Sequence, residues 1–523
     1  MKSTLTLGDG FVGVSPFPES LLSRLHYWKR VMGYNEGKHR REITSRDEVL
    51  YRIESGAGPD GRPVSTCFTL PGFAKRCKDH LAAAGYEVEV VDRRTPLPEP
   101  DWFAAMHGLR DYQQPLVYAM IMNGGGILAG ATGLGKSYVI KALCAAYPHE
   151  SMRFRGTPTI VVAVPDKDIT RQDYEALARL LPDRNVGLVM SGSRKFSEDI
   201  QVVTLDSLHL LNANDVGIVI VDEMHTASSD TRSSELLRFS KARFWGVSAT
   251  PDGRFDGKDV VAEGIFGPCV AQFTYQDGVK AGCLVPLKVF WLDAPEPQMG
   301  AENYCRYKER DSRYKWGVHN NTPLNKMIGR IFAGIPDSLQ TLGMLQFTDH
   351  MEAVLRGCAE AGVIPMPAQV HAGTDPKKFP PSSYWHVHAV SAKERKDTYD
   401  RMKAGELRKA ISTFCWKQGV SFDDLRIVVN LCGCGSEIFA KQVPGRASRK
   451  APGKDCAYII EFRHPWDKKK VKTKAGYTRE VAGPVFSDDV SRMKIYSELG
   501  FEQINLVSER ELPWIHSSST PTP

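Results

Sequence analysis

Long hydrophobic runs are missing from this sequence of 523 residues. No apolar stretch approaches the roughly 20 residues that a membrane-spanning helix needs. The first residues, from Met1 to Asp9, also lack the apolar block of a signal peptide. These two absences argue against a membrane or secreted protein, and they predict that the chain stays in the compartment where it is made.

Cysteine pairs with a recognisable spacing are also missing. The chain has 11 cysteines, an odd number, and no two of them are spaced as C-x-x-C. This usage argues against a disulfide framework and against a zinc knuckle, and it predicts reduced, buried thiols. The net charge of +7 is small for the length and does not by itself separate a nucleic-acid binder from an average protein. The length predicts several domains.

The clearest positive signal is a glycine-rich segment, Gly130–Ser137, which fits the pattern G-x-x-x-x-G-K-[ST] at every fixed position. An apolar run precedes it, and residues 137–144 have the pattern of a helix. In that context backbone N–H groups and the helix N-terminus bind phosphate. We expect Lys136 to reach the β- and γ-phosphates of a nucleotide and the Ser137 hydroxyl to hold Mg²⁺. The expected backbone contacts come from Gly130, Thr132, Gly133 and Gly135.

Apolar runs alternate with helical patterns around this segment. The predicted strands are Gly126–Ala129, Thr159–Val164, Ile200–Leu205, Val216–Val221 and Arg243–Ser248, and the clearest helix between them is Asp168–Leu181. Such alternation predicts a parallel sheet flanked by helices, with ligands at the carboxyl ends of the strands.

An acidic pair, Asp222 and Glu223, directly follows one of these buried strands. Carboxylates at the tip of a buried strand are costly unless they meet a cation. Beside a phosphate loop they predict a magnesium site, in which Asp222 holds Mg²⁺ and Glu223 polarises the attacking water.

At this point the residues resemble the superfamily 2 DExH-box helicases. Residues 222–225 spell Asp-Glu-Met-His, and Ser248–Pro251 resembles the family's Ser-Ala-Thr motif. Residues 109–113 resemble its Q motif, which implies that Arg110 and Gln113 bind ATP, with Gln113 hydrogen-bonded to the adenine edge. The resemblance also implies that two polar residues near strand ends, Gln172 and Thr204, contact nucleic acid.

The C-terminal half carries further motifs of this family in the expected order. Residues 344–348 resemble motif IV and residues 413–421 resemble motif V, which implies that Thr348 and Thr413 contact nucleic acid and that Gly419 lies near ATP. The segment Gln442–Arg449 matches Q-x-x-G-R-x-x-R, or motif VI. By resemblance, Gln442, Arg446 and Arg449 act in catalysis, and the two arginines reach the γ-phosphate across a cleft.

Within the superfamily, the likeness is strongest to the branch-migration group that includes UvsW, XPB and RecG. The Leu109–Gln113 start and the Gly419–Ser421 segment carry this likeness. Departures are Gln346 in motif IV, Ala447 in motif VI and an insertion at residues 376–385. The resemblance implies an ATP-dependent motor that remodels branched DNA by branch migration, fork regression and R-loop unwinding.

The expected fold class is α/β, with two tandem RecA-like parallel-sheet domains and a small α+β accessory domain at the N-terminus. We expect the accessory domain at residues 1–100, with a helix and then a strand within residues 73–91, RecA-like domains at 101–286 and 287–460, and a basic extension and tail at 461–523. We expect residues 285–297 to connect the two motor domains. Five lysines near Trp466 and Tyr477, at positions 468, 469, 470, 472 and 474, suit either a nucleic-acid contact or an exposed loop.

The expected cofactors are ATP and Mg²⁺, and the expected partner is DNA, single-stranded or branched, with RNA as an alternative. We expect a monomer without a membrane association, located in the cytoplasm, which is the host's if a phage encodes the chain. Three alternative hypotheses remain: an RNA helicase, the motor of a restriction or defence system, and a catalytically silent clamp that only binds nucleic acid. Against the restriction reading, Asp455, Glu461 and Arg463 lack the lysine that a nuclease site needs.

Overall fold

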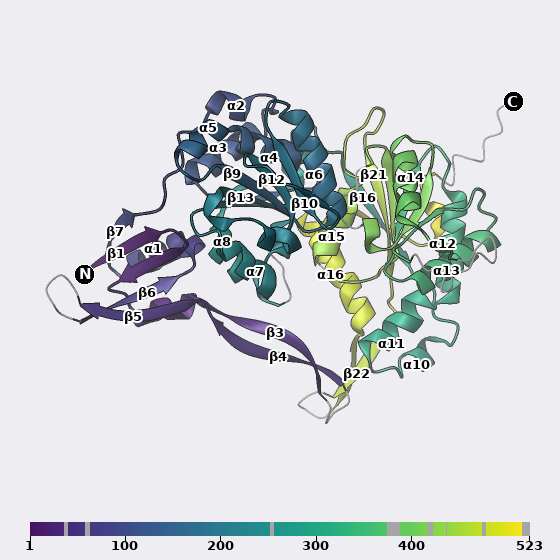
Figure 1. Cartoon of the computed structure of the whole chain (residues 1–523). Helices are drawn as coiled ribbons and strands as arrows, with labels where there is room; N and C mark the ends of the chain where they lie inside the picture. The colour runs from purple at the N-terminus through teal and green to yellow at the C-terminus, as the bar shows by residue number, and fades with distance from the viewer. Residues whose placement is uncertain are drawn as a thin grey trace. The chain divides into compact units, whose positions relative to one another are not determined.

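The computed structural model describes the whole chain except residues 36–39, 58–62, 252–255, 374–386, 417–421, 436, 473–476 and 515–523. The chain divides into two compact units, Met1–Thr274 and Tyr275–Pro523 (Figure 1). Each unit contains a large sheet of parallel strands, so the predicted α/β class with two RecA-like sheets is confirmed. No helix in the described ranges is long and apolar enough to cross a membrane.

An accessory sheet opens the first unit. Its strand order is β5-β6-β2-β1-β7, where β1 (Lys2–Gly8) pairs antiparallel with β2 (Phe11–Ser15) and parallel with β7 (Glu87–Asp92). The remaining strands are β5 (Tyr51–Ala57) and β6 (Pro63–Thr69), and α1 (Ala74–Ala83) packs on the sheet through Cys77 and Leu81. The predicted helix and strand within residues 73–91 are therefore confirmed.

A separate two-stranded ribbon, β3 (His26–Asn35) with β4 (Arg40–Val49), extends from the accessory sheet. Its base is joined to the motor part of the first unit by Asp230, which accepts from Lys29 at 2.8 Å and from Lys258 at 2.6 Å. A second ion pair joins Arg76 of α1 to Glu263. The accessory sheet and the first motor sheet thus form one unit.

The motor sheet of the first unit has the order β11-β10-β12-β9-β13-β14-β8-β15. Its strands are β8 (Gly126–Gly130), β9 (Thr159–Val164), β10 (Val186–Met190), β11 (Ser193–Lys195), β12 (Ile200–Thr204), β13 (Val216–Asp222), β14 (Arg243–Ser248) and β15 (Cys269–Phe273). Among the described residues, the strands of this sheet pair in parallel, except that the short edge strand β11 pairs antiparallel with β10. Every residue of β13 is buried, as expected for a central parallel strand covered on both faces.

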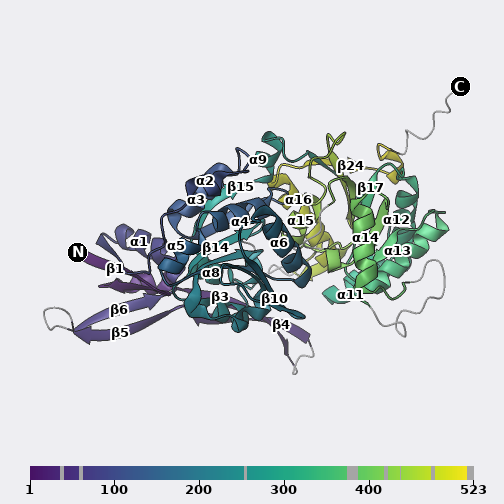
Figure 2. The same cartoon turned by 45° about the horizontal axis from the view of Figure 1, so that its top comes forward.

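Helices cover both faces of this sheet (Figure 2). They are α2 (Trp102–Met106), α3 (Gln114–Asn123), α4 (Lys136–Ala145), α5 (His149–Phe154), α6 (Lys167–Leu180), α7 (Asp230–Leu237) and α8 (Asp259–Phe266). Asp166 begins α6 by accepting a hydrogen bond from the backbone of Asp168 at 2.8 Å. The helix predicted at Asp168–Leu181 is therefore confirmed within one residue at each end.

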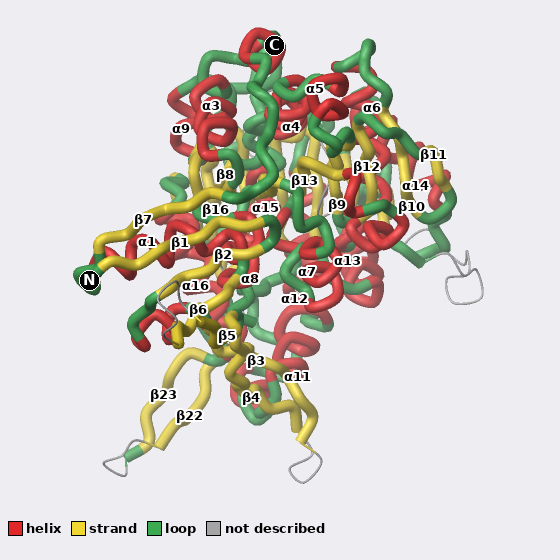
Figure 3. The backbone as a smooth tube through the Cα atoms, turned by 60° about the vertical axis from the view of Figure 1, so that its left-hand side comes forward, coloured by secondary structure: helices red, strands yellow, loops and turns green. Residues whose placement is uncertain are grey.

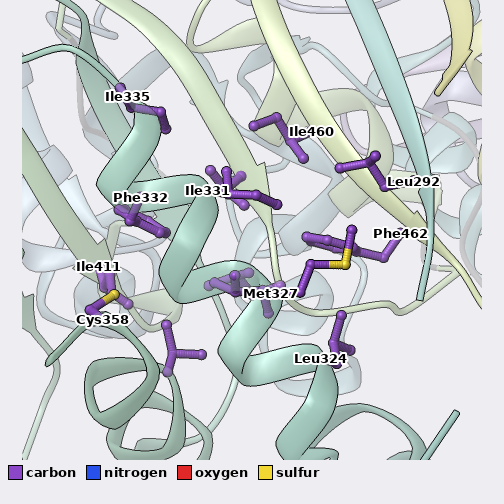
Figure 4. Packing of buried hydrophobic residues seen from close by; sticks show 14 of the residues in the cluster. Leu292, Leu324, Met327, Ile331, Phe332, Ile335, Cys358, Ile411, Ile460 and Phe462 are labelled. Carbon is purple, nitrogen blue, oxygen red and sulfur yellow. The ribbon is translucent and has the colours of Figure 1, made fainter. Parts of the chain in front are cut away.

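The second unit contains a parallel sheet with the order β18-β19-β17-β20-β21-β16-β24. Its strands are β16 (Leu287–Asp293), β17 (Gln340–Met344), β18 (Ala368–Val370), β19 (Lys409–Ser412), β20 (Leu425–Asn430), β21 (Ala457–Arg463) and β24 (Glu502–Leu506). The helices are α9 (Tyr275–Lys280), α10 (Ala301–Tyr304), α11 (Arg310–Tyr314), α12 (Thr322–Gly334), α13 (Thr348–Glu360), α14 (Ala392–Lys403), α15 (Glu437–Gly445) and α16 (Pro484–Glu498). In Figure 4, Leu324, Met327 and Ile331 of α12 face Leu292, Ile460 and Phe462 of the strands.

Two predictions about the second unit were wrong. Residues 285–297 are no passage between domains, because β16 lies inside the sheet between β21 and β24. Residues 461–523 are no separate extension, because β21 continues to Arg463 and β24 pairs with β16. The chain therefore returns to the sheet after motif VI, and among the described strands after Arg463 the hairpin β22 (Lys468–Lys472) with β23 (Thr478–Ala482) stands outside it.

Candidate nucleotide-binding site

Three predicted motifs meet at one edge of the first motor sheet. The strands β13, β14 and β8 are neighbours and parallel, so their carboxyl ends lie side by side. These ends carry Asp222, Ser248 and Gly130. The phosphate loop, the acidic pair and the Ser-Ala-Thr segment are therefore brought together at the edge where parallel sheets bind ligands.

The phosphate loop has the backbone that its glycines predict. Gly133 and Gly135 have φ values of 93° and 83°, in the left-handed region that favours glycine. A Cβ atom on Gly130 would lie 2.5 Å from Leu134 Cδ2, so a side chain there would require the buried Leu134 side chain to move. Helix α4 begins at Lys136 without a side-chain cap, so the N–H groups of its first turn remain available to bind phosphate. Of the other predicted ligands, Thr132 lies in the loop and Ser137 in this first turn.

Lys136 binds both acidic residues of the DExH segment. Its ammonium contacts Glu223 Oε1 and lies 3.5 Å from Asp222 Oδ1. Burial disfavours the charged lysine, but the two carboxylates outweigh burial and raise the pKa of Lys136 above its ordinary value. Burial likewise raises the pKa of Asp222, although the charge of Lys136 opposes that rise. The loop lysine and both carboxylates therefore converge on one point.

Glu223 is held in a strained conformation. Its φ of 48° and ψ of 48° lie in the left-handed region, which is rare for a residue other than glycine. Such strain is typical of functional sites. Glu223 Oε2 is buried and accepts no hydrogen bond from any described residue, and His225 Nδ1 lies 3.5 Å from it. One carboxylate oxygen therefore keeps its capacity to bind a water molecule or a cation.

His225 connects the acidic pair to the next motif. Its Nδ1 lies 2.9 Å from Ser248 Oγ, and Ser248 Oγ accepts a hydrogen bond from the backbone N–H of Thr250 at 3.0 Å. All three side chains are buried. A displacement at the acidic pair can therefore pass directly to the Ser-Ala-Thr segment.

Asp173 is a further site residue, which the sequence analysis missed. It lies on α6, is 6% exposed, and its Oδ2 has no hydrogen-bond partner in the described part of the chain. Burial, followed by the charge of Asp222, raises its pKa well above the ordinary range, while Lys136 opposes that rise. The signal for it was the four-residue spacing of Ile169, Asp173 and Leu177, which places all three on the buried side of α6.

The residues present fit a nucleotide with Mg²⁺. No group of three or more His, Cys, Asp or Glu side chains among the described residues forms a ready metal site. Mg²⁺ usually keeps several waters and takes few protein ligands besides the phosphates of its nucleotide. Asp222 and Ser137 are the predicted ligands of this kind, and Glu223 Oε2, on the residue after Asp222, is buried without a hydrogen-bond partner among the described residues.

The Q segment, which contains the predicted ATP-binding residues Arg110 and Gln113, contacts the phosphate loop through Gln113. Gln113 is buried, its Nε2 donates to the Leu134 carbonyl at 2.9 Å, and its Oε1 accepts from the Arg110 backbone at 3.0 Å. The Arg110 side chain donates to the Tyr112 hydroxyl at 3.0 Å. The Tyr112 ring stacks on Phe273 with centroids 5.0 Å apart. The Q segment is thus tied to the loop, and its contact with adenine stays a prediction.

The predicted nucleic-acid contacts of the first unit differ in exposure. Gln172 is exposed on α6, whereas Thr204 is buried at the end of β12 and donates to Ser207 Oγ at 2.7 Å. In the second unit, Thr348 begins α13 and is half-buried, and buried Thr413 follows β19 and bonds to the Val370 carbonyl. Motif IV therefore spans a strand end and a helix start, because β17 ends at Met344.

The motif VI residues also lie in the second unit. Gln442 is on α15, and both atoms of its amide are buried without a partner in the described residues. Arg446 is buried just after α15, and Arg449 lies 3.8 Å from Asp423. Burial lowers the pKa of Arg449. Their reach to the γ-phosphate stays a prediction, as does the role of Gly419, which lies outside the described residues.

Comparisons with known proteins agree with this site. Residues 106–253 match the family described as Type III restriction enzyme, res subunit. Rad25 of Haloarcula marismortui, named as a DNA 3'-5' helicase, is 24% identical over 369 residues, which are 67% of this chain and 52% of that protein. The DNA 3'-5' translocase XPB2 of Sulfurisphaera tokodaii is 30% identical over 166 residues, which are 31% of this chain and 35% of XPB2. The chain spans about half the length of these relatives or less.

Solved structures give the fold. The Type ISP restriction-modification enzyme LlaBIII is 14% identical with a TM-score of 0.51, and the match covers 82% of this chain and 34% of the LlaBIII chain. A Dbp5 structure from S. cerevisiae is 13% identical with a TM-score of 0.51, and the match covers 80% of this chain and 96% of Dbp5. The match to UvsW of T4 covers 97% of this chain and 99% of UvsW, at 15% identity and with a TM-score of 0.39.

The fold and the site define the class first: a RecA-like, P-loop nucleotide-binding protein. Within that class, the chain resembles the superfamily 2 helicases, with its sequence matches in the XPB and Rad25 group. The predicted family resemblance is therefore confirmed.

Proposed function

We propose that the chain is an ATP-driven motor that moves along DNA and separates or remodels its strands. The observation that carries the proposal is the bonding of Lys136 to both Asp222 and Glu223 at the carboxyl edge of a parallel sheet. A lysine, a magnesium-binding aspartate and a water-orienting glutamate at one point are what phosphoryl transfer requires.

Each residue of the site has a definite task. Lys136 and the N–H groups at the start of α4 neutralise phosphate charge, and Ser137 and Asp222 hold the metal. Glu223 orients a water molecule and accepts its proton, for which its unpartnered Oε2 is suited. Bound ATP with Mg²⁺ supplies the phosphoanhydride bond whose cleavage drives movement. In this proposal Arg446, Arg449 and Gln442 also act in catalysis, and the two arginines act on the γ-phosphate.

The hydrogen bond between His225 and Ser248, and that from the Thr250 backbone N–H to Ser248, couple this chemistry to movement. In the proposal, Gln172, Thr204, Thr348 and Thr413 contact the phosphate backbone, and Gly419 lies near the nucleotide. Backbone contacts of this kind bind many sequences and weaken as salt rises. We further propose that branched DNA is the substrate and that one chain acts alone; the names of Rad25 and XPB2 support DNA over RNA.

ATP hydrolysis tests the proposal when measured without polymer, with single-stranded DNA, with a four-way DNA junction and with single-stranded RNA, at one salt concentration. We expect DNA to stimulate hydrolysis most, with the junction at least equal to single strands. Lys136→Ala should abolish turnover while DNA binding persists, and Lys241→Ala, a change of the same kind at an exposed position, should retain turnover. Hydrolysis that persists in Lys136→Ala would refute the site, and stimulation by RNA alone would favour an RNA helicase.

A second candidate is the motor of a restriction system, which the match of residues 106–253 to a restriction-enzyme family favours. Such a motor can translocate along intact duplex without separating its strands. Displacement of a third strand from a linear triplex, without unwinding of forked DNA, would support this candidate. Unwinding of the fork would support the helicase.

A further inference from the structure

The hairpin of β22 and β23 carries a strong excess of positive charge outside the nucleotide site. Residues 468–482 contain six cationic residues and one acidic residue. The two strands pair from Lys468↔Ala482 to Lys472↔Thr478, with no other strand beside them in the described structure. Figure 3 shows the two strands running side by side. The hairpin therefore buries no core of its own and exposes its backbone ribbon and its charges.

Cations occupy both faces of this hairpin. Successive side chains on a strand point to opposite faces, so Lys468 and Lys470 share one face and Lys469 lies on the other. The register places Arg479 opposite Val471, on the face of Lys469. All four cations are exposed. The single acidic residue, Glu480, lies 3.7 Å from Lys468 and offsets only one of them.

The root of the hairpin, in contrast, is buried and fully bonded. Asp467 is 0% exposed, forms an ion pair with buried Arg313, and accepts from the backbone of Val485 at 2.8 Å and Phe486 at 3.1 Å. Arg313 also donates to the Lys468 carbonyl at 2.9 Å. The first residue of β22 is thereby fixed to α11 and to the start of α16, so the hairpin is held at a set angle to its unit.

These features suit a partner that is negatively charged on two sides. An isolated two-stranded hairpin is only marginally stable, and crowded like charges weaken it further, so a polyanion between or around the lysines would stabilise it. The major groove of duplex DNA is about 12 Å wide and admits a two-stranded β-ribbon with phosphates on both flanks. Single strands are instead bound through stacked aromatic residues, and residues 468–482 contain one, Tyr477.

We propose that the β22–β23 hairpin binds the duplex part of the motor's DNA substrate, with its two faces toward the two phosphate backbones. The inference rests on the proposed function, because it assigns a second DNA contact to the same motor. The strand-end residues of the two sheets would hold the single strand, and the hairpin would hold the duplex arm that adjoins it. A substrate with both parts would then bind more tightly than either part alone.

The test is a variant that carries Lys468→Ala, Lys469→Ala and Lys470→Ala together. Its control carries Lys393→Ala, Lys396→Ala and Lys403→Ala, which remove the same charge from exposed positions of α14 in the same unit. Binding to a short blunt duplex and to a single strand of the same sequence is measured by fluorescence anisotropy over a salt series, without nucleotide. Hydrolysis of ATP with saturating single-stranded DNA is measured in parallel.

We expect the hairpin variant to bind the duplex about 10-fold more weakly and to lower the slope of log affinity against log salt by about 2–3. Single-strand affinity and stimulated hydrolysis should stay within about two-fold of the unmodified chain, because neither uses the hairpin. Unchanged duplex affinity and salt slope would overturn the proposal. An equal loss for single strands, or an equal loss in the control, would overturn it too. Absence of DNA-stimulated hydrolysis in the unmodified chain would instead refute the motor, a result independent of these binding measurements.

Discussion

Each unit buries a cluster of charged side chains at its sheet, but the two clusters are completed differently. In the second unit, fully buried Arg492 bonds to Glu461 at 3.1 Å and to Asp489 at 2.9 Å. Asn430 and Tyr496 donate to the remaining oxygen of Glu461 at 2.7 Å and 2.6 Å. In the first unit, one lysine faces three carboxyl groups, and two of their oxygens, Asp173 Oδ2 and Glu223 Oε2, lack a hydrogen-bond partner among described residues.

The difference separates a structural cluster from a functional one. Burial opposes the charge of Arg492, but Glu461 and Asp489 outweigh burial and raise its pKa. Both oxygens of Glu461 and both of Asp489 have hydrogen-bond partners, so this cluster is complete without a ligand. Asp173, Asp222 and Glu223 instead place three carboxyl groups around one lysine, and burial raises the pKa of Asp173 and of Asp222 although Lys136 opposes both rises. Uncompensated buried charge is costly, so the protein retains it where a ligand supplies the missing cation. The contrast also explains why Glu461, whose segment lacks the lysine of a nuclease site, serves the fold.

The largest effect should follow from Glu223→Gln, which keeps the shape of the side chain but removes the base. We expect DNA-stimulated ATP hydrolysis to fall by about 10²–10⁴-fold while nucleotide binding persists. The folded protein should lose no stability, because the change removes one of the excess negative charges. Rates from steady-state kinetics and melting temperatures check both parts, with exposed Glu175→Gln as the control. A hydrolysis rate equal to that of the control would remove Glu223 from the mechanism.

Arg492→Leu should have the opposite profile. It leaves Glu461 and Asp489 buried without their cation, which costs about 3–5 kcal/mol of unfolding free energy. Chemical denaturation measures this loss, and exposed Lys494→Leu on the same helix provides the control. Any protein that remains folded should bind nucleotide normally at Lys136. A change below about 1 kcal/mol would show that the two clusters do not differ as argued.

Asp173→Asn should stabilise the first unit in a pH-dependent way. Burial raises the pKa of Asp173 in the folded protein, so the folded state binds a proton more tightly than the unfolded chain does. The aspartate therefore costs stability as the pH rises above its unfolded value of about 3.9 toward the raised pKa. Asparagine removes that cost, so we expect a gain of about 1 kcal/mol or more at neutral pH and a smaller gain near pH 4. A gain that is equal at both pH values would contradict this account.

Much of the first unit could be predicted from its sequence because its strands are continuous apolar runs with glycine or acidic residues at their ends. Strands β9 and β14 have the predicted bounds, and the phosphate loop lies between the predicted strand and helix. Asp173 was missed because a charged residue beside exposed Gln172 has the usual pattern of a solvated helix face. Its burial depends on which side of α6 meets α4, and that is a tertiary contact.

The second unit was harder to predict for a similar reason. Strand β16 lies between prolines at 286 and 295, which are typical of a linker, and its burial depends on pairing with the distant β21 and β24. Helix α16 buries Asp488, Asp489 and Arg492, so its sequence lacks an apolar stripe. Buried charges that pair with each other are invisible to a search for hydrophobic periodicity.

The smallest effect concerns Glu480, whose exposed pair with Lys468 contrasts with the buried pair of Arg313 and Asp467 at the root of the same hairpin. Exposed pairs contribute at most about 1 kcal/mol, so Glu480→Gln should leave the melting temperature nearly unchanged. It should also free Lys468 to meet a phosphate and remove the only acidic residue of the hairpin, which predicts duplex binding about two-fold to five-fold tighter with a steeper salt dependence. Glu498→Gln, which frees Lys494 on α16 in the same way, is the matched control and should leave duplex binding unchanged. Weaker duplex binding in Glu480→Gln would mean that Glu480 holds the ribbon in shape, and the exposed and buried pairs of the hairpin would then both be structural.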